Sequence, residues 1–196
     1  MDISEFKTYL HYRTAIALRS PDSSQEKALL RAVGYTQLLA DDATQSSLEP
    51  WVNTKLLAYE ELYWAIRSQR DTTASGGVDT NGLEQSQVMM RNAVRSCLPD
   101  SLQPMAASLL NVYFEALRTL PPTAPSDKDA EVAKPAPSHL EVVTVTSKRS
   151  AYVIAVDTQD CRVSFRHFEI LPMFWNASLK LADDVDDDIE RHLKTL

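Results

Sequence analysis

The stretch LEVVTVTSKRSAYVIAVDTQDCRVSFRHFEI, residues 140–170, decides the predicted fold. It holds three runs, 140–146, 151–157 and 161–170, that are rich in valine, isoleucine, threonine and aromatic residues, a composition typical of β-strands. The connections between the runs are short and polar, so they predict a three-stranded antiparallel meander. The middle run is apolar on both faces, and so small a sheet is marginal alone, so we expect a helix or a partner to cover it.

The C-terminal segment LADDVDDDIERHLKTL, residues 181–196, is a candidate cover for this sheet. Apolar residues recur in it every three or four positions, which predicts an amphipathic helix with the acidic residues on its solvated face. These apolar residues are Leu181, Val185, Ile189, Leu193 and Leu196. A calcium-binding EF-hand loop starting at Asp184 is disfavoured, because Ile189 stands where the loop needs glycine and Thr195 where it needs glutamate.

The region before the sheet, residues 1–120, predicts a module of about five helices. Apolar residues at helical spacing begin at Ile3 and continue through Phe6, Leu10 and Ala17, which predicts the first helix. A second helix is predicted from Ser23, and Gly34 inside it indicates close packing against a neighbour. The strongest helical stripe consists of Val52, Leu56, Tyr59, Tyr63 and Ile66. The composition of DTTASGGVDTNG, residues 71–82, predicts a loop.

Residues 121–138 hold five of the ten prolines and no aromatic residue, which predicts an extended spacer. The predicted fold class is therefore α+β in three parts. A helical module at 1–120 is followed by a Pro-rich linker at 121–138, and residues 139–196 form a small β-meander with an amphipathic C-terminal helix.

The overall charge and the start of the chain limit the classes of protein. The net charge of −7 and the pI near 5.1 disfavour general nucleic-acid binding, which needs a basic surface. No apolar run approaches the length of a membrane span, and the start, MDISEFKTYL, does not resemble a secretory signal. We therefore expect a cytoplasmic protein, or one inside an intracellularly assembled particle, and two lone cysteines fit a reducing compartment.

Known sequence signatures of active sites are missing from the chain. It has no GxxxxGK[ST], GxGxxG or GxSxG motif, and its four histidines fall in four different predicted elements. Cys161 and His167 share a strand face but lie roughly 20 Å apart at the usual rise, too far for a catalytic pair. We therefore expect no metal site, no cofactor and no small-molecule substrate.

The preferred hypothesis is a non-catalytic protein–protein interaction subunit, an adaptor or assembly component of a larger complex such as a virion or a secretion apparatus. The C-terminal part is too small to form a hydrophobic core of its own, so it should dock on a protein partner or on a second copy of the chain. Candidate interface residues come from three places: an aromatic segment after the last strand, basic residues of the meander, and the apolar stripe of the last helix. They are Met173, Phe174, Trp175, Lys148, Arg149, Arg162, Arg166, Leu181, Val185, Ile189 and Leu193.

Two alternatives remain open at the level of sequence. The first is an enzyme of unrecognised class with a pocket in the helical module, for which the first candidates are Tyr59, Tyr63, His11 and Arg13. The second is nucleic-acid contact through a small patch formed by Lys148, Arg149, Arg162 and Arg166. The balance of charges around the meander makes this second alternative the weaker one.

Overall fold

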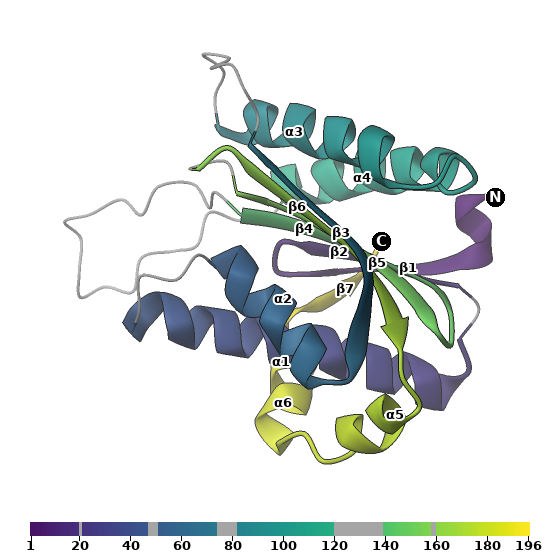
Figure 1. Cartoon of the computed structure of the whole chain (residues 1–196), viewed down its shortest axis with the longest axis vertical. Coiled ribbons are helices and arrows are strands. Elements are labelled where there is room, and N and C mark those ends of the chain that lie inside the picture. The colour runs from purple at the N-terminus through teal and green to yellow at the C-terminus, as the bar shows by residue number, and fades with distance from the viewer. Residues whose placement is uncertain (20, 47–50, 74–81, 120–138, 158–159) are drawn as a thin grey trace.

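The computed structural model describes residues 1–19, 21–46, 51–73, 82–119, 139–157 and 160–196 (Figure 1). These residues form one seven-stranded sheet with helices on both of its faces. The strand order is β3-β6-β5-β4-β2-β1-β7. Neighbouring strands are antiparallel except for β2 and β4, which run parallel.

The described residues form seven strands and six α-helices. The strands are β1 (Phe6–His11), β2 (Thr14–Arg19), β3 (Trp64–Thr73), β4 (His139–Ser147), β5 (Ser150–Asp157), β6 (Arg162–Ile170) and β7 (Leu193–Thr195). The helices are α1 (Ser23–Ser46), α2 (Trp51–Glu61), α3 (Gly82–Cys97), α4 (Gln103–Thr119), α5 (Met173–Ser178) and α6 (Asp183–His192), and a 3-10 turn at Ile3–Glu5 precedes β1.

The predicted fold class is wrong in its architecture, although the chain is α+β. The strands β4, β5 and β6 are not a separate three-stranded meander but the middle of a sheet that β3 extends on one side and β2, β1 and β7 on the other. Helices are not confined to an N-terminal bundle, because α5 and α6 follow β6. The apolar faces of the middle strands are covered by other parts of the same chain. The predicted linker, 121–138, lies outside the described residues.

The first predicted helix is wrong because residues 6–19 form a β-hairpin, with Tyr9 opposite Ile16. Strand β2 lies between β1 and β4 and is buried along almost its whole length. Its sequence is therefore a nearly continuous apolar run and lacks the alternating apolar and polar residues of a half-exposed strand. The turn contains Tyr12 in a left-handed conformation, with φ of 50°. Tight hairpins usually place asparagine or glycine there, so the sequence lacks the usual signal of a turn.

The strongest predicted helical stripe crosses the boundary between two elements. Helix α2 ends at Glu61, and Trp64 begins strand β3. Tyr63 lies between them with φ of 63°, the left-handed conformation that commonly ends a helix at glycine or asparagine. Because a tyrosine holds this position, the sequence gives no signal for the end of the helix. Strand β3 also extends to Thr73, so the predicted loop at 71–82 is wrong over its first three residues, and 74–81 lie outside the described residues.

The C-terminal helix is shorter than predicted. Helix α6 ends at His192, and Leu193–Thr195 pair with β1 as strand β7. The predicted close packing at Gly34 is confirmed: a Cβ atom there would lie 3.0 Å from Ile189 Cγ1 of α6. This glycine therefore lets α1 and α6 approach each other closely.

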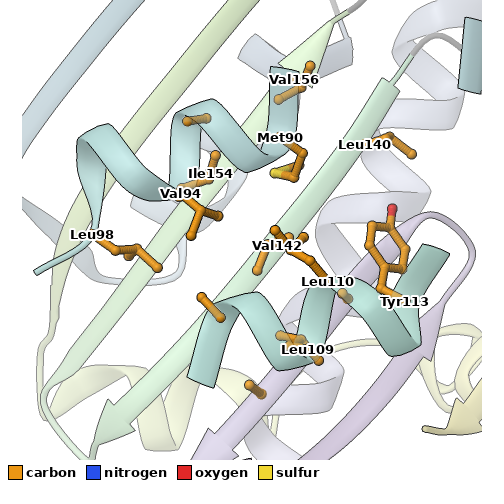
Figure 2. Packing of buried hydrophobic residues seen from close by; sticks show 14 of the residues in the cluster. Met90, Val94, Leu98, Leu109, Leu110, Tyr113, Leu140, Val142, Ile154 and Val156 are labelled. Atoms are coloured by element: carbon orange, nitrogen blue, oxygen red, sulfur yellow. The ribbon is translucent and has the colours of Figure 1, made fainter. Parts of the chain in front are cut away.

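Two hydrophobic layers fill the space between the sheet and its helices. On one face, α3 and α4 direct residues such as Met90, Val94 and Leu110 toward Val142 and Ile154 of the central strands (Figure 2). Helices α1, α2, α5 and α6 cover the other face (Figure 1). Among the described helices, none is both long and apolar enough to cross a membrane.

Candidate functional site

A row of polar residues crosses the sheet on the face that α1 and α2 cover. In the strand register, Asp71 is opposite Ser164, Ser164 opposite Ala155, Ala155 opposite Glu141, Glu141 opposite Thr14, and Thr14 opposite His11. Residues directly opposite each other in a sheet point to the same face. Only Ala155 interrupts this polar row. His11, Thr14, Glu141 and Ser164 are buried, whereas Asp71 at one end of the row is exposed.

The centre of the polar row is an ion pair in the protein interior. Lys55 of α2 and Glu141 of β4 are both 0% exposed, and Lys55 Nζ lies 3.3 Å from Glu141 Oε2. The same ammonium group donates to Thr14 Oγ1 at 3.1 Å and to Gln37 Oε1 at 3.2 Å, while Tyr59 Oη donates to Glu141 Oε1 at 2.8 Å. Buried charges are tolerated only when they are paired and hydrogen-bonded. Lys55 meets both conditions, whereas Glu141 is paired and accepts a hydrogen bond at Oε1 but none at Oε2 from the described residues.

Burial also shifts the ionisation of the groups in this pair. Burial lowers the pKa of Lys55, and the carboxylate of Glu141 opposes that shift. Burial raises the pKa of Tyr59, and Glu141 raises it further, so the phenol is a neutral donor. The ring of Trp51 lies 4.8 Å from Lys55 Nζ and adds a cation–π contact.

Asp188 of α6 is the acceptor at the other end of the row. Its carboxylate accepts hydrogen bonds from His11 Nε2 at 2.9 Å, from Tyr12 Oη at 2.6 Å and from His192 Nδ1 at 3.0 Å. Asp188 and His11 are both buried, whereas His192 reaches the surface. Tyr12 is the residue with the left-handed backbone, a conformation that persists only where surrounding contacts hold it. This Asp188 cluster, which consists of His11, Tyr12, Asp188 and His192, ties the last helix to the first hairpin.

His11 is a neutral imidazole, although it lies within ion-pair distance of Asp188. Burial, with a smaller contribution from the charge of Lys55, lowers its pKa to about 4 against the opposing effect of Asp188. A hydrogen on Nε2 is donated to Asp188, and Nδ1 is buried with no hydrogen-bond partner among the described residues. Protonation would create a second N–H without an acceptor, which accounts for the low affinity of this ring for a proton.

Because His11 is buried and neutral, we expect the free energy of unfolding to decrease in acid. Because its pKa is near 4 when folded and about 6.5 when unfolded, the unfolded state binds the proton more tightly between these values. The contribution of neutral His11 is complete above pH 6.5 and falls by about 3 kcal/mol as the pH decreases to about 4. Urea unfolding of wild type and His11→Gln at pH 7 and pH 4.5 measures it. Equal pH dependence in the two proteins would contradict the assignment.

The four residues of the enzyme hypothesis are only partly brought together. His11 and Tyr59 both join the buried polar row, through Asp188 and Glu141 respectively. Tyr63 lies on the surface with 45% of its side chain exposed. Arg13 lies in the hairpin turn, where its carbonyl accepts hydrogen bonds from Tyr113 Oη and from the backbone of Glu141. Among the described residues, no group of three His, Cys, Asp or Glu side chains is arranged to hold a metal ion.

The outer side of strand β3 is the longer of the two edges of the described sheet. This strand is ten residues long and pairs with β6 along its length, and the sheet order places it outermost. Of its ten residues, only Trp64 is buried and eight are exposed. We call this side, residues 64–73, the free edge. An edge strand presents unpaired N–H and C=O groups to any extended chain that approaches.

Apolar side chains lie at the start of the free edge. The backbone N–H of Leu171 donates to the carbonyl of Tyr63 at 3.0 Å, which holds the start of α5 beside the start of β3. Tyr63 is 45% exposed and Met173 of α5 is 51% exposed, and Ile66 is also at the surface. Exposed apolar residues beside an open strand are typical of a surface that contacts another protein.

Most of the predicted interface residues have contacts within their own chain. Phe174 is fully buried against Trp64, with ring centroids 5.8 Å apart, whereas Met173 is exposed and Trp175 is half-buried. The predicted stripe of the last helix packs into the core on the side of α1. Leu181, Ile189 and Leu193 pack there, and Val185 is buried near Gly34 of α1. Leu196, the fifth residue of the predicted stripe, packs instead against the hydrophobic layer on the opposite face.

The predicted basic patch is divided between two ends of the sheet. Lys148 and Arg149 lie in the turn before β5, whereas Arg162 is opposite Asp157 at the other end of that strand. Eight residues of strand separate these ends, which is about 25 Å. Arg166 forms two hydrogen bonds to Asp71, at 2.9 and 3.1 Å, and Arg162 bonds to Asn53. The geometry therefore does not bring the four cations into one patch.

Comparison with known proteins found no matching family model, no matching curated protein and no matching solved structure.

Sequence reasoning did not identify Lys55 and Asp188 as members of a buried network. A signal for Lys55 is present in the sequence, because it falls among the inward positions Val52, Leu56 and Tyr59 of α2. Glu141 likewise occupies an inward position of a strand. Opposite charges at two inward positions indicate a buried pair, but only the tertiary structure shows that they meet.

Proposed function

We propose that this chain is a non-catalytic protein-binding subunit of a larger assembly and that its free edge receives an extended strand from a partner protein. The observation that carries the proposal is the exposure of β3, the outermost strand, over eight of its ten residues. Addition of a strand to an exposed sheet edge is a recurrent mode of peptide recognition, in which main-chain hydrogen bonds supply much of the affinity. The other outer strand, β7, is only three residues long.

Features that protect an edge from pairing are present but limited in extent. Bulges and charged side chains commonly prevent one sheet edge from joining another. The irregularity in β3 lies between Ile66 and Ser68, which leaves the register regular from Ser68 to Thr73. The charged side chains of this segment are held within the chain, since Arg70 donates to the carbonyl of Ser96 and Asp71 accepts from Arg166. A partner strand of about six residues would fit the regular part.

The buried polar row supports a binding role over a catalytic one. Lys55 and Glu141 are fully buried and form an ion pair with each other, and Asp188 accepts hydrogen bonds from three neighbours. These contacts hold the helices and both ends of the chain on the sheet, so the charged groups of the row serve the packing of the fold. The location in the cytoplasm or in an intracellular particle remains part of this proposal.

Proline substitutions at Gln69 and Thr72 test the proposal. These positions are three residues apart, so their N–H groups point to opposite sides of β3 and one of them faces the free edge. Proline at the outward position should leave the melting temperature close to that of wild type, because it removes no hydrogen bond to β6. Peptides selected from a displayed library of extended sequences should bind wild type, protect β3 amides from hydrogen exchange, and fail to bind this proline variant.

Alanine at the same position is the matched control, because it removes the side chain and keeps the N–H group. The alanine variant should bind the selected peptides as wild type does. Peptides that bind the outward proline variant as tightly as wild type, or that protect amides elsewhere but not in β3, would rule out the edge as the binding site.

A further inference from the structure

A groove runs between α3 and α4 on the opposite side of these helices from the sheet. Its volume is about 550 Å³. Val94 and Leu110 lie at its floor, since both are buried, and the exposed Pro104 and Ala107 line the α4 side. Gln103 fixes the turn between the two helices, because its side-chain amide donates to the carbonyls of Arg95 and Leu98 and to Asp100. The groove thus lies between two packed helices and combines an apolar floor with polar and charged residues at its rim.

Two arginines line the α3 side of this groove without an acidic partner. Arg91 and Arg95 are exposed and one helical turn apart, and neither forms an ion pair with any of the described residues. Among the other described arginines, Arg19, Arg31, Arg67, Arg118 and Arg166 form ion pairs, whereas Arg70, Arg162 and Arg191 donate to uncharged oxygens within the chain. Asp100 also lines the groove, but the amide of Gln103 bonds to it. The groove is therefore locally basic on a chain whose net charge is −7.

The exposed stripe of α3 extends this surface along the helix. Val88 precedes Arg91 by three residues, so the two share one face, and Val88 is 48% exposed. A surface that combines a small apolar floor with two cations one turn apart complements a helix that has carboxylates one turn apart beside its apolar face. Amphipathic helices commonly bind in such grooves, and complementary charges at the rim set their orientation and specificity.

We infer that the groove between α3 and α4 binds an amphipathic helix of a partner protein, with acidic side chains of that helix placed against Arg91 and Arg95. This contact is separate from the free edge of β3, so it gives the chain a second binding surface. A chain with two such surfaces can hold two partners, which is the arrangement that an adaptor requires.

Charge exchange tests the inference directly. The probe is a synthetic amphipathic helical peptide with leucine and alanine on one face and two glutamates one turn apart, together with a twin in which lysines replace the glutamates. The glutamate peptide should bind wild type, with an affinity that decreases as salt is added. The R91E/R95E variant should bind it at least about tenfold more weakly, because like charges then face each other, and should bind the lysine twin instead.

Filling the groove provides a test that does not alter charge. Ala107→Trp should prevent binding of the glutamate peptide, whereas Val112→Trp, at an exposed position of α4 outside the groove, should not. The inference is overturned if the glutamate peptide does not bind wild type, if it binds R91E/R95E equally well, or if Ala107→Trp has no effect. The outward proline variant of β3 should leave the peptide affinity unchanged, so failure here is distinguishable from failure of the edge proposal.

Discussion

Replacement of Glu141 by glutamine should lower the free energy of unfolding by about 3–5 kcal/mol. The substitution preserves the shape of the side chain and an acceptor for Tyr59, but it leaves the ammonium group of Lys55 in the protein interior without its ion-pair partner. Equilibrium unfolding in urea at pH 7 measures the effect. The surface variant Glu190→Gln, which makes the same chemical change on α6, should lie within about 0.5 kcal/mol of wild type.

A second substitution separates the charge from the loss of packing. The double variant Lys55→Met/Glu141→Gln removes the isolated charge, so it should be more stable than Glu141→Gln alone. The single variant should also become more stable as the pH rises, because an unpaired buried lysine has a lower pKa when folded than when unfolded. A double variant less stable than the single one would mean that the ion pair is not the source of the effect.

Replacement of Asp188 by alanine should cost about 3 kcal/mol and loosen the C-terminal part of the chain. The change removes the common acceptor of His11 and Tyr12 and leaves buried donors without a partner, each at a cost of about 1–3 kcal/mol. Because β7 pairs with β1 over only three residues, the loss should appear locally. Hydrogen exchange should become faster in α6 and β7 while it remains slow in β4, β5 and β6.

Asp187→Ala is the matched control, since the neighbouring residue on the same helix is exposed. It should leave both the free energy of unfolding and the exchange of β7 close to those of wild type. Uniformly faster exchange in Asp188→Ala would instead show that the Asp188 cluster supports the whole sheet and not only its C-terminal edge.

These variants connect the buried network to the proposed function. The two hypothesised binding surfaces, the free edge of β3 and the α3–α4 groove, lie on elements whose positions the network does not set directly. Variants of the network should therefore change stability and the attachment of the C-terminus before they change binding. Variants of the surfaces should have the reverse effect, which allows the two roles to be measured separately.

The sequence by itself determined the elements whose signals are local. The β-branched runs at 140–146, 151–157 and 161–170 are strands β4, β5 and β6 with small differences at their ends. The helix predicted from Ser23 is α1. The close packing predicted at Gly34 of this helix is its approach to Ile189 of α6. Composition and periodicity suffice in these places because the side chains alone favour one conformation.

Only the tertiary structure decided the rest of the sheet. Residues 6–19 and 64–73 are strands because neighbouring strands pair with them, and the turns that lead into them contain Tyr12 and Tyr63 in left-handed conformations where a sequence signal would be glycine or asparagine. The charged interior has the same origin, since Lys55 and Glu141 are far apart in the chain and meet only through the packing of α2 on β4. Pairing between distant segments sets both features, and no local pattern of side chains specifies which segments will meet.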